Sequence, residues 1–121
     1  MKKSFSKIAF ISLVLVLFIG LIFIGCAGRG SPTTIVRQLH TAVERGDNAR
    51  ISELMTPEAA ALALKMLQEL QRAYAASGGI ASMEQTITSN TAVVRVTYRN
   101  GDTDNYDLVR VDGRWRVTLA K

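Results

Sequence analysis

The chain has only one cysteine and one histidine among its 121 residues. A single cysteine cannot form a disulfide within the chain. The sequence also lacks a glycine-rich phosphate-binding loop, a serine nucleophile motif and the ligand spacing of a zinc site. We therefore expect no catalytic residues, no metal and no cofactor, and the sequence indicates a protein that is not an enzyme.

A strong excess of one charge is missing from most of the chain. The formal charge is +5, but three of the 15 lysines and arginines lie in residues 1–25, which contain no acid. The remaining 96 residues hold 12 basic and 10 acidic side chains, and the basic ones are scattered. Because nucleic-acid binding proteins concentrate basic residues in a patch, no nucleic-acid partner is predicted.

The longest apolar run lies at the N-terminus. Three lysines within the first seven residues precede the uncharged segment 8–24, and Gly25, Cys26 and Ala27 follow it. A basic start, an apolar stretch and a small residue before a cleavage site are typical of an export signal. The Gly25-Cys26 junction at the end of this run resembles the bacterial lipobox, in which the cysteine takes a diacylglyceryl group before cleavage.

This resemblance implies that cleavage between Gly25 and Cys26 leaves a lipidated cysteine as the first residue, carrying fatty acyl chains such as palmitate. Ala27 then points to the outer membrane where the cell has one, and to the cell membrane otherwise. The alternative is an uncleaved transmembrane anchor, because an apolar run of 17 residues is long enough to span a bilayer. In both cases the lysines keep the N-terminus in the cytoplasm and place the rest in the periplasm or outside.

We accordingly divide the chain into a lipoprotein signal peptide at 1–25, a lipidated tether at 26–31 and one domain at 32–121.

The spacing of apolar residues predicts helices throughout the first half of this domain. A helix over 32–45 begins with Ser31 as its cap, and a short second helix begins after Asp47. A long third helix is predicted to run from Pro57 to about Ala76, with the apolar residues Leu62, Leu64, Met66, Leu67, Leu70 and Tyr74.

The second half of the domain alternates apolar and polar residues between turn signals. Asn100-Gly101 and Asp112-Gly113 are strong hairpin dipeptides, so neighbouring strands should pair antiparallel. The four predicted strands are 81–88, 91–99, 104–111 and 114–119.

The turns also predict the register of the sheet. A two-residue turn at Asp112-Gly113 puts Arg110 opposite Trp115, and a three-residue loop around Gly101 keeps the apolar positions of the middle strands on one face. The predicted inner face is Val94, Val96, Tyr98, Tyr106, Leu108, Arg110, Trp115, Val117 and Leu119. The predicted outer face carries Arg95, Thr97, Asp107, Arg116 and Thr118.

This order of helices and strands resembles the nuclear transport factor two-like, cystatin-like α+β cone in a reduced form. The segments 32–47 and 106–117 also look like those of short bacterial envelope lipoproteins of unknown function with that fold. The resemblance implies no enzymatic residues, and we expect a membrane-anchored protein with a small, non-enzymatic domain that binds a ligand or an envelope protein. The alternatives are an uncleaved single-pass protein with the same outward-facing domain, and a small enzyme that uses the cavity of the cone.

Four residues of the predicted inner face form the candidate ligand pocket: Tyr98, Tyr106, Arg110 and Trp115. An arginine on an apolar face is costly unless it is paired or reaches water. Its guanidinium could stack on the indole and still donate hydrogen bonds to a small anionic or lipid-like ligand. The alternative is that the rings pack in the core and Arg110 reaches the solvent.

Two further candidates are given structural roles. His40 lies between apolar residues of the first helix, and no acid or nucleophile is spaced to work with it, so we expect a partly buried structural histidine. Asp102, Asp104 and Asp107 lack the loop length and the terminal glutamate of an EF-hand, so we expect no metal there.

Overall fold

The computed structural model describes residues 30–119. The predicted signal peptide at 1–25, the lipidation site Cys26 and most of the tether lie outside the described residues. Within the described part, no helix is long and apolar enough to cross a bilayer.

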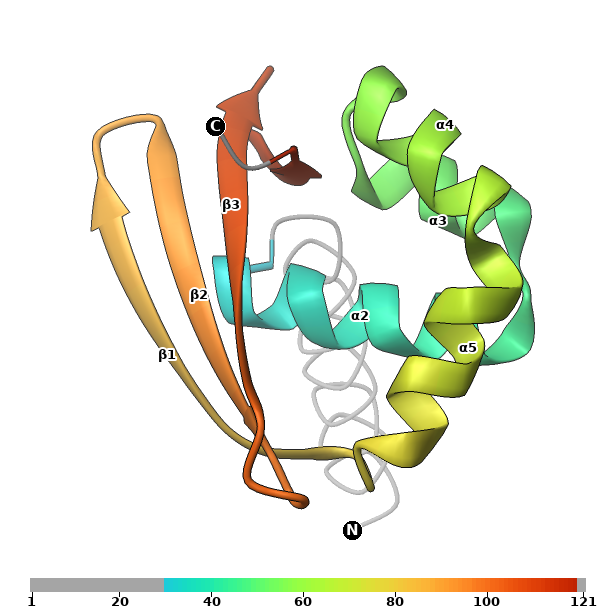
Figure 1. Cartoon of the computed structure of the whole chain (residues 1–121). Helices are drawn as coiled ribbons and strands as arrows, with labels where there is room; N and C mark the ends of the chain where they lie inside the picture. The colour runs from blue at the N-terminus through green and yellow to red at the C-terminus, as the bar shows by residue number, and fades with distance from the viewer. Residues whose placement is uncertain (1–29, 120–121) are drawn as a thin grey trace, which may run out of the picture.

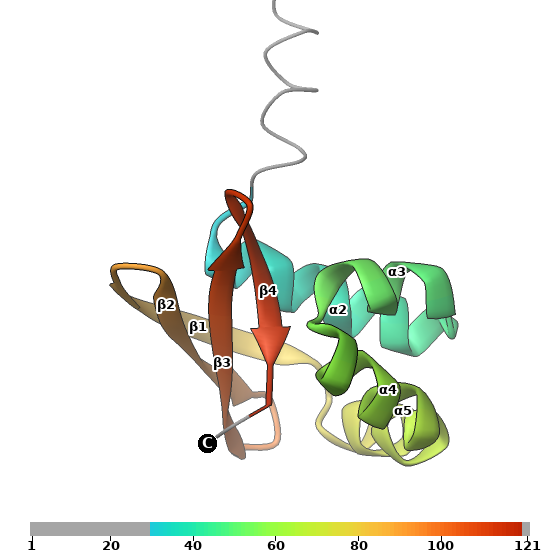
Figure 2. The same ribbon diagram turned by 90° about the horizontal axis from the view of Figure 1, so that it is seen from above.

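Four helices precede a four-stranded antiparallel sheet and cover one of its faces (Figures 1 and 2). This is the predicted α+β architecture. The helices are α2 (Pro32–Arg45), α3 (Asn48–Leu54), α4 (Pro57–Lys65) and α5 (Leu67–Ala76). The strands are β1 (Ile80–Thr88), β2 (Thr91–Tyr98), β3 (Thr103–Val111) and β4 (Arg114–Thr118), and they lie side by side in sequence order.

The predicted caps set the ends of the first two helices. The Ser31 side chain accepts a hydrogen bond from the Thr34 amide, and Pro32 takes the first helical position of α2. Gly46 ends α2 in the left-handed conformation, with φ of 66°, which glycine adopts without steric cost. The Asp47 side chain then accepts from the Arg50 amide and begins α3.

The prediction of one long third helix is wrong, because Met66 separates α4 from α5 with φ of −106° and ψ of 18°. The change of direction lets α4 pack on α3 and β4 while α5 packs on α2. Among the apolar residues of this predicted helix, Leu62 is 44% exposed and Met66 is 39% exposed. The residues of α4 that face the core are small and let the helix lie close to its neighbours: Ala59, Ala60 and Ala63.

The predicted register of the sheet is confirmed. Val94 lies opposite Tyr106, and Arg110 lies opposite Trp115. The amide of Tyr98 donates to the Asp102 carbonyl across a three-residue loop, in which Gly101 has φ of 92°. Asp112 and Gly113 form the two-residue turn, both at positive φ, as a type I′ hairpin requires.

The core fills the space between the helices and the inner face of the sheet. Six predicted inner-face residues are buried there: Val94, Val96, Tyr98, Leu108, Trp115 and Val117. Tyr106 is partly buried against them, and Ala92 joins them at the start of β2. Leu119 is 41% exposed because β4 ends at Thr118, so its predicted place in the inner face is wrong.

Candidate functional site

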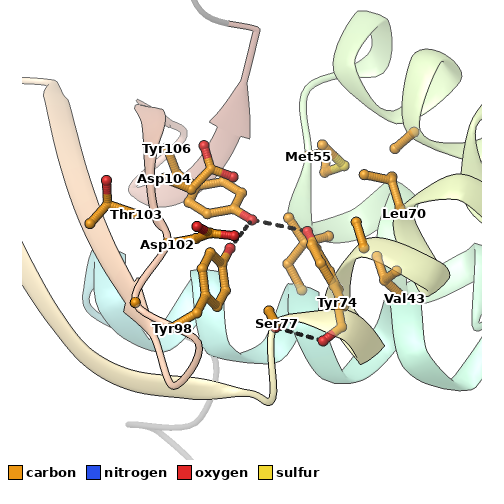
Figure 3. Close-up of a pocket in the computed structure, with 14 residues that line it drawn as sticks. Val43, Met55, Leu70, Tyr74, Ser77, Tyr98, Asp102, Thr103, Asp104 and Tyr106 are labelled. Atoms are coloured by element: carbon orange, nitrogen blue, oxygen red, sulfur yellow. Dashed lines mark hydrogen bonds between the residues drawn. The ribbon is translucent and has the colours of Figure 1, made fainter.

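A cavity of about 670 Å³ opens between the β2–β3 hairpin and helices α2 and α5 (Figure 3). One wall is apolar and comes from the helices, whereas the other carries aromatic and acidic residues of the hairpin. The lining residues are Leu39, Val43, Met55, Ala63, Leu70, Ala73, Tyr74, Ser77, Tyr98, Gly101, Asp102, Thr103, Asp104 and Tyr106.

Three tyrosines meet at this cavity and form a hydrogen-bonded cluster with His40. The Tyr106 hydroxyl lies 3.0 Å from the Tyr74 hydroxyl and 3.2 Å from the Tyr98 hydroxyl. It also lies 3.0 Å from Nε2 of His40. Figure 3 shows the three phenols converging from α5, β2 and β3. Tyr106 is therefore the centre of what we call the phenol cluster, which consists of His40, Tyr74, Tyr98 and Tyr106.

His40 is buried beneath the phenols, with 5% of its surface exposed. Its ring stacks on that of Tyr74 at a centroid distance of 3.9 Å and an angle of 15°. Burial, assisted by the nearby positive charge of Arg37, lowers the pKa of His40 to about 4. The imidazole is consequently neutral at pH 7 and keeps one nitrogen free to accept a hydrogen bond.

The phenols keep their protons at all ordinary pH values. Burial raises the pKa of Tyr74 to about 12 and also raises the pKa of Tyr98. Burial raises the pKa of Tyr106 as well, and the neighbouring hydroxyl of Tyr74 raises it further. No charge therefore resides on these four rings at neutral pH.

One pattern of donors and acceptors uses every phenol proton within the cluster. In the pattern with the shorter contact to His40, Tyr106 donates to Nε2 over 3.0 Å, and Tyr74 and Tyr98 each donate to the Tyr106 oxygen. The alternative donor to Nε2 is Tyr98, whose hydroxyl lies 3.4 Å away, with Tyr106 then donating to Tyr98. Protonating Nε2 instead would leave at least one phenol proton without a partner inside the cluster, so we assign the proton of His40 to Nδ1. In this pattern the oxygens of Tyr74 and Tyr98 retain lone pairs that no member of the cluster uses.

The rim of the cavity is acidic. Asp102 and Asp104 are exposed residues of the β2–β3 hairpin that line its opening. Asn100 donates its side-chain amide to Asp102 over 3.0 Å, which orients that carboxylate. None of the described residues that line the cavity is basic. Three or more potential metal ligands do not come together anywhere in residues 30–119.

The residues predicted to form one pocket occupy two places. Tyr98 and Tyr106 line the cavity, but Arg110 and Trp115 do not. Arg110 is exposed, and its guanidinium carbon lies 4.4 Å from the centre of the indole ring of Trp115. The predicted stacking is therefore present at the surface, beside a core tryptophan and away from the cavity. Gly25 and Cys26 lie outside the described residues.

Sequence reasoning missed two members of the phenol cluster, His40 and Tyr74. The sequence did contain a signal for His40, which falls on the buried stripe of α2 together with Val36, Leu39 and Val43. A histidine on such a stripe needs a hydrogen-bond partner from another element. Tyr74 and Tyr106, which supply the stacking and the hydrogen bond, are 34 and 66 residues further along the chain.

Helices packed on one face of a four-stranded antiparallel sheet, with a cavity between them, define an NTF2-like cone, which is the nuclear transport factor two-like fold expected from the sequence. The structure is similar to that of a proposed NTF2-like transpeptidase of Campylobacter jejuni, with a TM-score of 0.53 over 74% of this chain and 100% of that chain. The two sequences are 18% identical, so the likeness concerns the fold alone. No family model and no curated protein matches the sequence.

Proposed function

We propose that this chain is a lipid-anchored envelope protein whose domain binds a small, partly apolar ligand in the cavity. The observation that carries the proposal is the cavity itself. Its volume of about 670 Å³ falls in the range of about 300–1,000 Å³ that is usual for small-molecule sites. Its apolar wall and its convergent hydroxyls are the combination by which such sites hold and orient a ligand.

The chemistry of the phenol cluster favours binding over catalysis. A general acid or base works best when its pKa lies near the working pH. The pKa of His40 is lowered to about 4 and those of the tyrosines are raised. These groups are therefore suited to give and accept hydrogen bonds without changing their charge.

Peptide transfer, the activity ascribed to the Campylobacter protein, needs a nucleophile that this cavity does not offer. The one serine among the described lining residues, Ser77, is buried and donates its hydroxyl proton to the Tyr74 carbonyl over 2.6 Å. The only cysteine of the chain, Cys26, belongs to the proposed lipid anchor. A nucleophilic serine or cysteine requires an adjacent base that takes its proton, and Ser77 lacks this arrangement.

The anchor is supported by the basic start, the apolar run and the Gly25-Cys26 junction. Each methylene of an inserted acyl chain contributes about 0.8 kcal/mol, so two or three chains hold a protein durably at a bilayer.

We expect the native protein to begin at Cys26 and to carry acyl chains, as measured by intact mass. The Cys26→Ser variant should keep residues 1–25 and gain mass accordingly. A mass that differs from the parent only by the exchange of sulfur for oxygen would show that the segment is an uncleaved anchor.

The cavity is tested by filling it. Ala73 lies on α5 and lines the cavity, whereas the exposed Ala75 lies on the same helix and does not. We expect 2-phenylethanol, a small neutral probe with an aromatic body, to shift the methyl signal of Met55 saturably in carbon-13 methionine spectra. The Ala73→Phe variant should lose this response because the new ring occupies the cavity. Ala75→Phe should keep it, and an equal loss in both variants would contradict binding at this place.

A further inference from the structure

The polar side chains that line the cavity act almost entirely as hydrogen-bond acceptors. With the proton of His40 assigned to Nδ1, every phenol proton can be used within the cluster, so Tyr74 and Tyr98 then present lone pairs. The Ser77 proton is used by a backbone carbonyl. The rim adds two carboxylates, and the Thr103 hydroxyl is the only side-chain donor left among the described lining residues. A ligand that fits this surface must itself donate hydrogen bonds.

The charge around the opening has one sign. Asp102 and Asp104 line the cavity, and none of its described lining residues is basic. The electrostatic potential of Asp104 is felt at the phenol cluster. Beside burial, this negative charge contributes to the raised pKa of both Tyr74 and Tyr98. A cation between the rim and the cluster is therefore stabilised, and an anion is repelled.

The aromatic rings that line the cavity also favour a cation. The rings of Tyr98 and Tyr106 line the cavity, and the faces of such rings attract ammonium groups. Beyond them, the wall made by Leu39, Val43 and Leu70 can take only an apolar group. The two halves of the site thus require different halves of one ligand.

We propose that the cavity selects an organic cation, namely a primary ammonium group carried on a small apolar body. The ammonium lies between the rim carboxylates and the oxygens of Tyr74 and Tyr98, and the body lies against the helices. This inference rests on the proposed function, since it names the class of ligand for the same cavity.

The experiment compares three probes that share one body and differ in charge: 2-phenylethylammonium, 2-phenylethanol and phenylacetate. The full chain is held in phosphatidylcholine nanodiscs with carbon-13 methionine methyl groups, and empty nanodiscs correct for partitioning of the probes into lipid. Met55 lines the cavity and reports binding. Met66 does not line it and serves as the internal control.

We expect the ammonium probe to bind about fivefold or more tightly than the alcohol. Each of the two exposed carboxylates should contribute about as much binding free energy as one surface ion pair does. Phenylacetate should bind more weakly than either. Replacing both rim carboxylates, Asp102→Asn with Asp104→Asn, should bring the affinity for the ammonium down to that for the alcohol. The alcohol itself should bind as before. Asp107→Asn removes one charge outside the cavity, from the strand that also carries Asp104, and should change nothing.

Two results would overturn this assignment while leaving the binding function intact. One is equal affinity for the ammonium and the alcohol, and the other is a preference for the ammonium that survives the double asparagine substitution. Absence of any Met55 response to all three probes would instead overturn the binding function together with the cation selectivity.

Discussion

Replacing Trp115 with alanine should lower the free energy of unfolding by about 3–5 kcal/mol. The indole is 8% exposed and belongs to the core cluster. It lies on the inner face of β4, the strand that packs against α2, α3 and α4. Removing it deletes apolar contacts with the core and leaves a space that the surrounding elements cannot fill completely. Arg110 would also lose the ring over which its guanidinium lies.

Urea unfolding of a fragment of residues 30–121, followed by circular dichroism, measures this loss. Val111→Ala is a suitable control because Val111 is 40% exposed and lies in the same hairpin, so its loss should change stability by about 0.5 kcal/mol or less. A decrease below about 1 kcal/mol for Trp115→Ala would place the ring outside the core. Such a result would contradict the packing of the sheet on the helices.

The same fragment should lose up to about 3 kcal/mol of stability as the pH falls from 7 to 4, because His40 is buried in its neutral form. The pKa of His40 is about 4 in the folded protein, against 6.5 for a solvent-exposed histidine such as that of the unfolded chain. Between these values the unfolded chain binds more protons than the folded one. The contribution is therefore complete above pH 6.5 and declines as the pH falls toward 4.

His40→Phe isolates this effect from that of the carboxylates. Phenylalanine keeps a flat ring against Tyr74 but cannot take up a proton, so the stability of the variant should depend less on pH between 4 and 6.5. The variant will be less stable than the parent at pH 7 because Tyr106 loses its acceptor. Parallel pH profiles for the two proteins would show that His40 is already accessible to protons in the folded state.

The sheet was predictable because its information is local. Asn100-Gly101 and Asp112-Gly113 each specify a hairpin, and the alternation of apolar residues selects one register from the few that such turns permit. The caps Ser31 and Asp47 likewise act within one turn of their helices. These features depend on contacts between residues a few positions apart, which a sequence displays directly.

The helix break at Met66 was not predictable by the same reasoning. Residues 57–76 contain good helix formers throughout, and nothing in them after the first position is a strong breaker. The break depends on where α4 and α5 find partners, since one packs on α3 and β4 and the other on α2. For the same reason the buried face of α4 consists of alanines, although larger apolar side chains were available beside them.

The candidate site was predicted in part. Tyr98 and Tyr106 were expected to share the inner face, and they do line the cavity. They were grouped with Arg110 and Trp115 because the prediction used the strand register alone. The register does not determine which part of the inner face the helices cover. His40 and Tyr74 come from α2 and α5, so only the packing of helices on the sheet brings them to Tyr106.

The start of helix α2 has a consequence for where the domain stands. Helix α2 begins beside the middle of β1, where the Thr33 amide donates to the Gln85 side chain, whereas the β2–β3 hairpin with its acidic rim lies at one end of the strands (Figure 1). On the proposed anchoring at Cys26, the five peptide units to Ser31 reach at most about 18 Å. The domain would then stand close to the bilayer. Its ligand would reach the cavity in the layer of water next to the membrane surface.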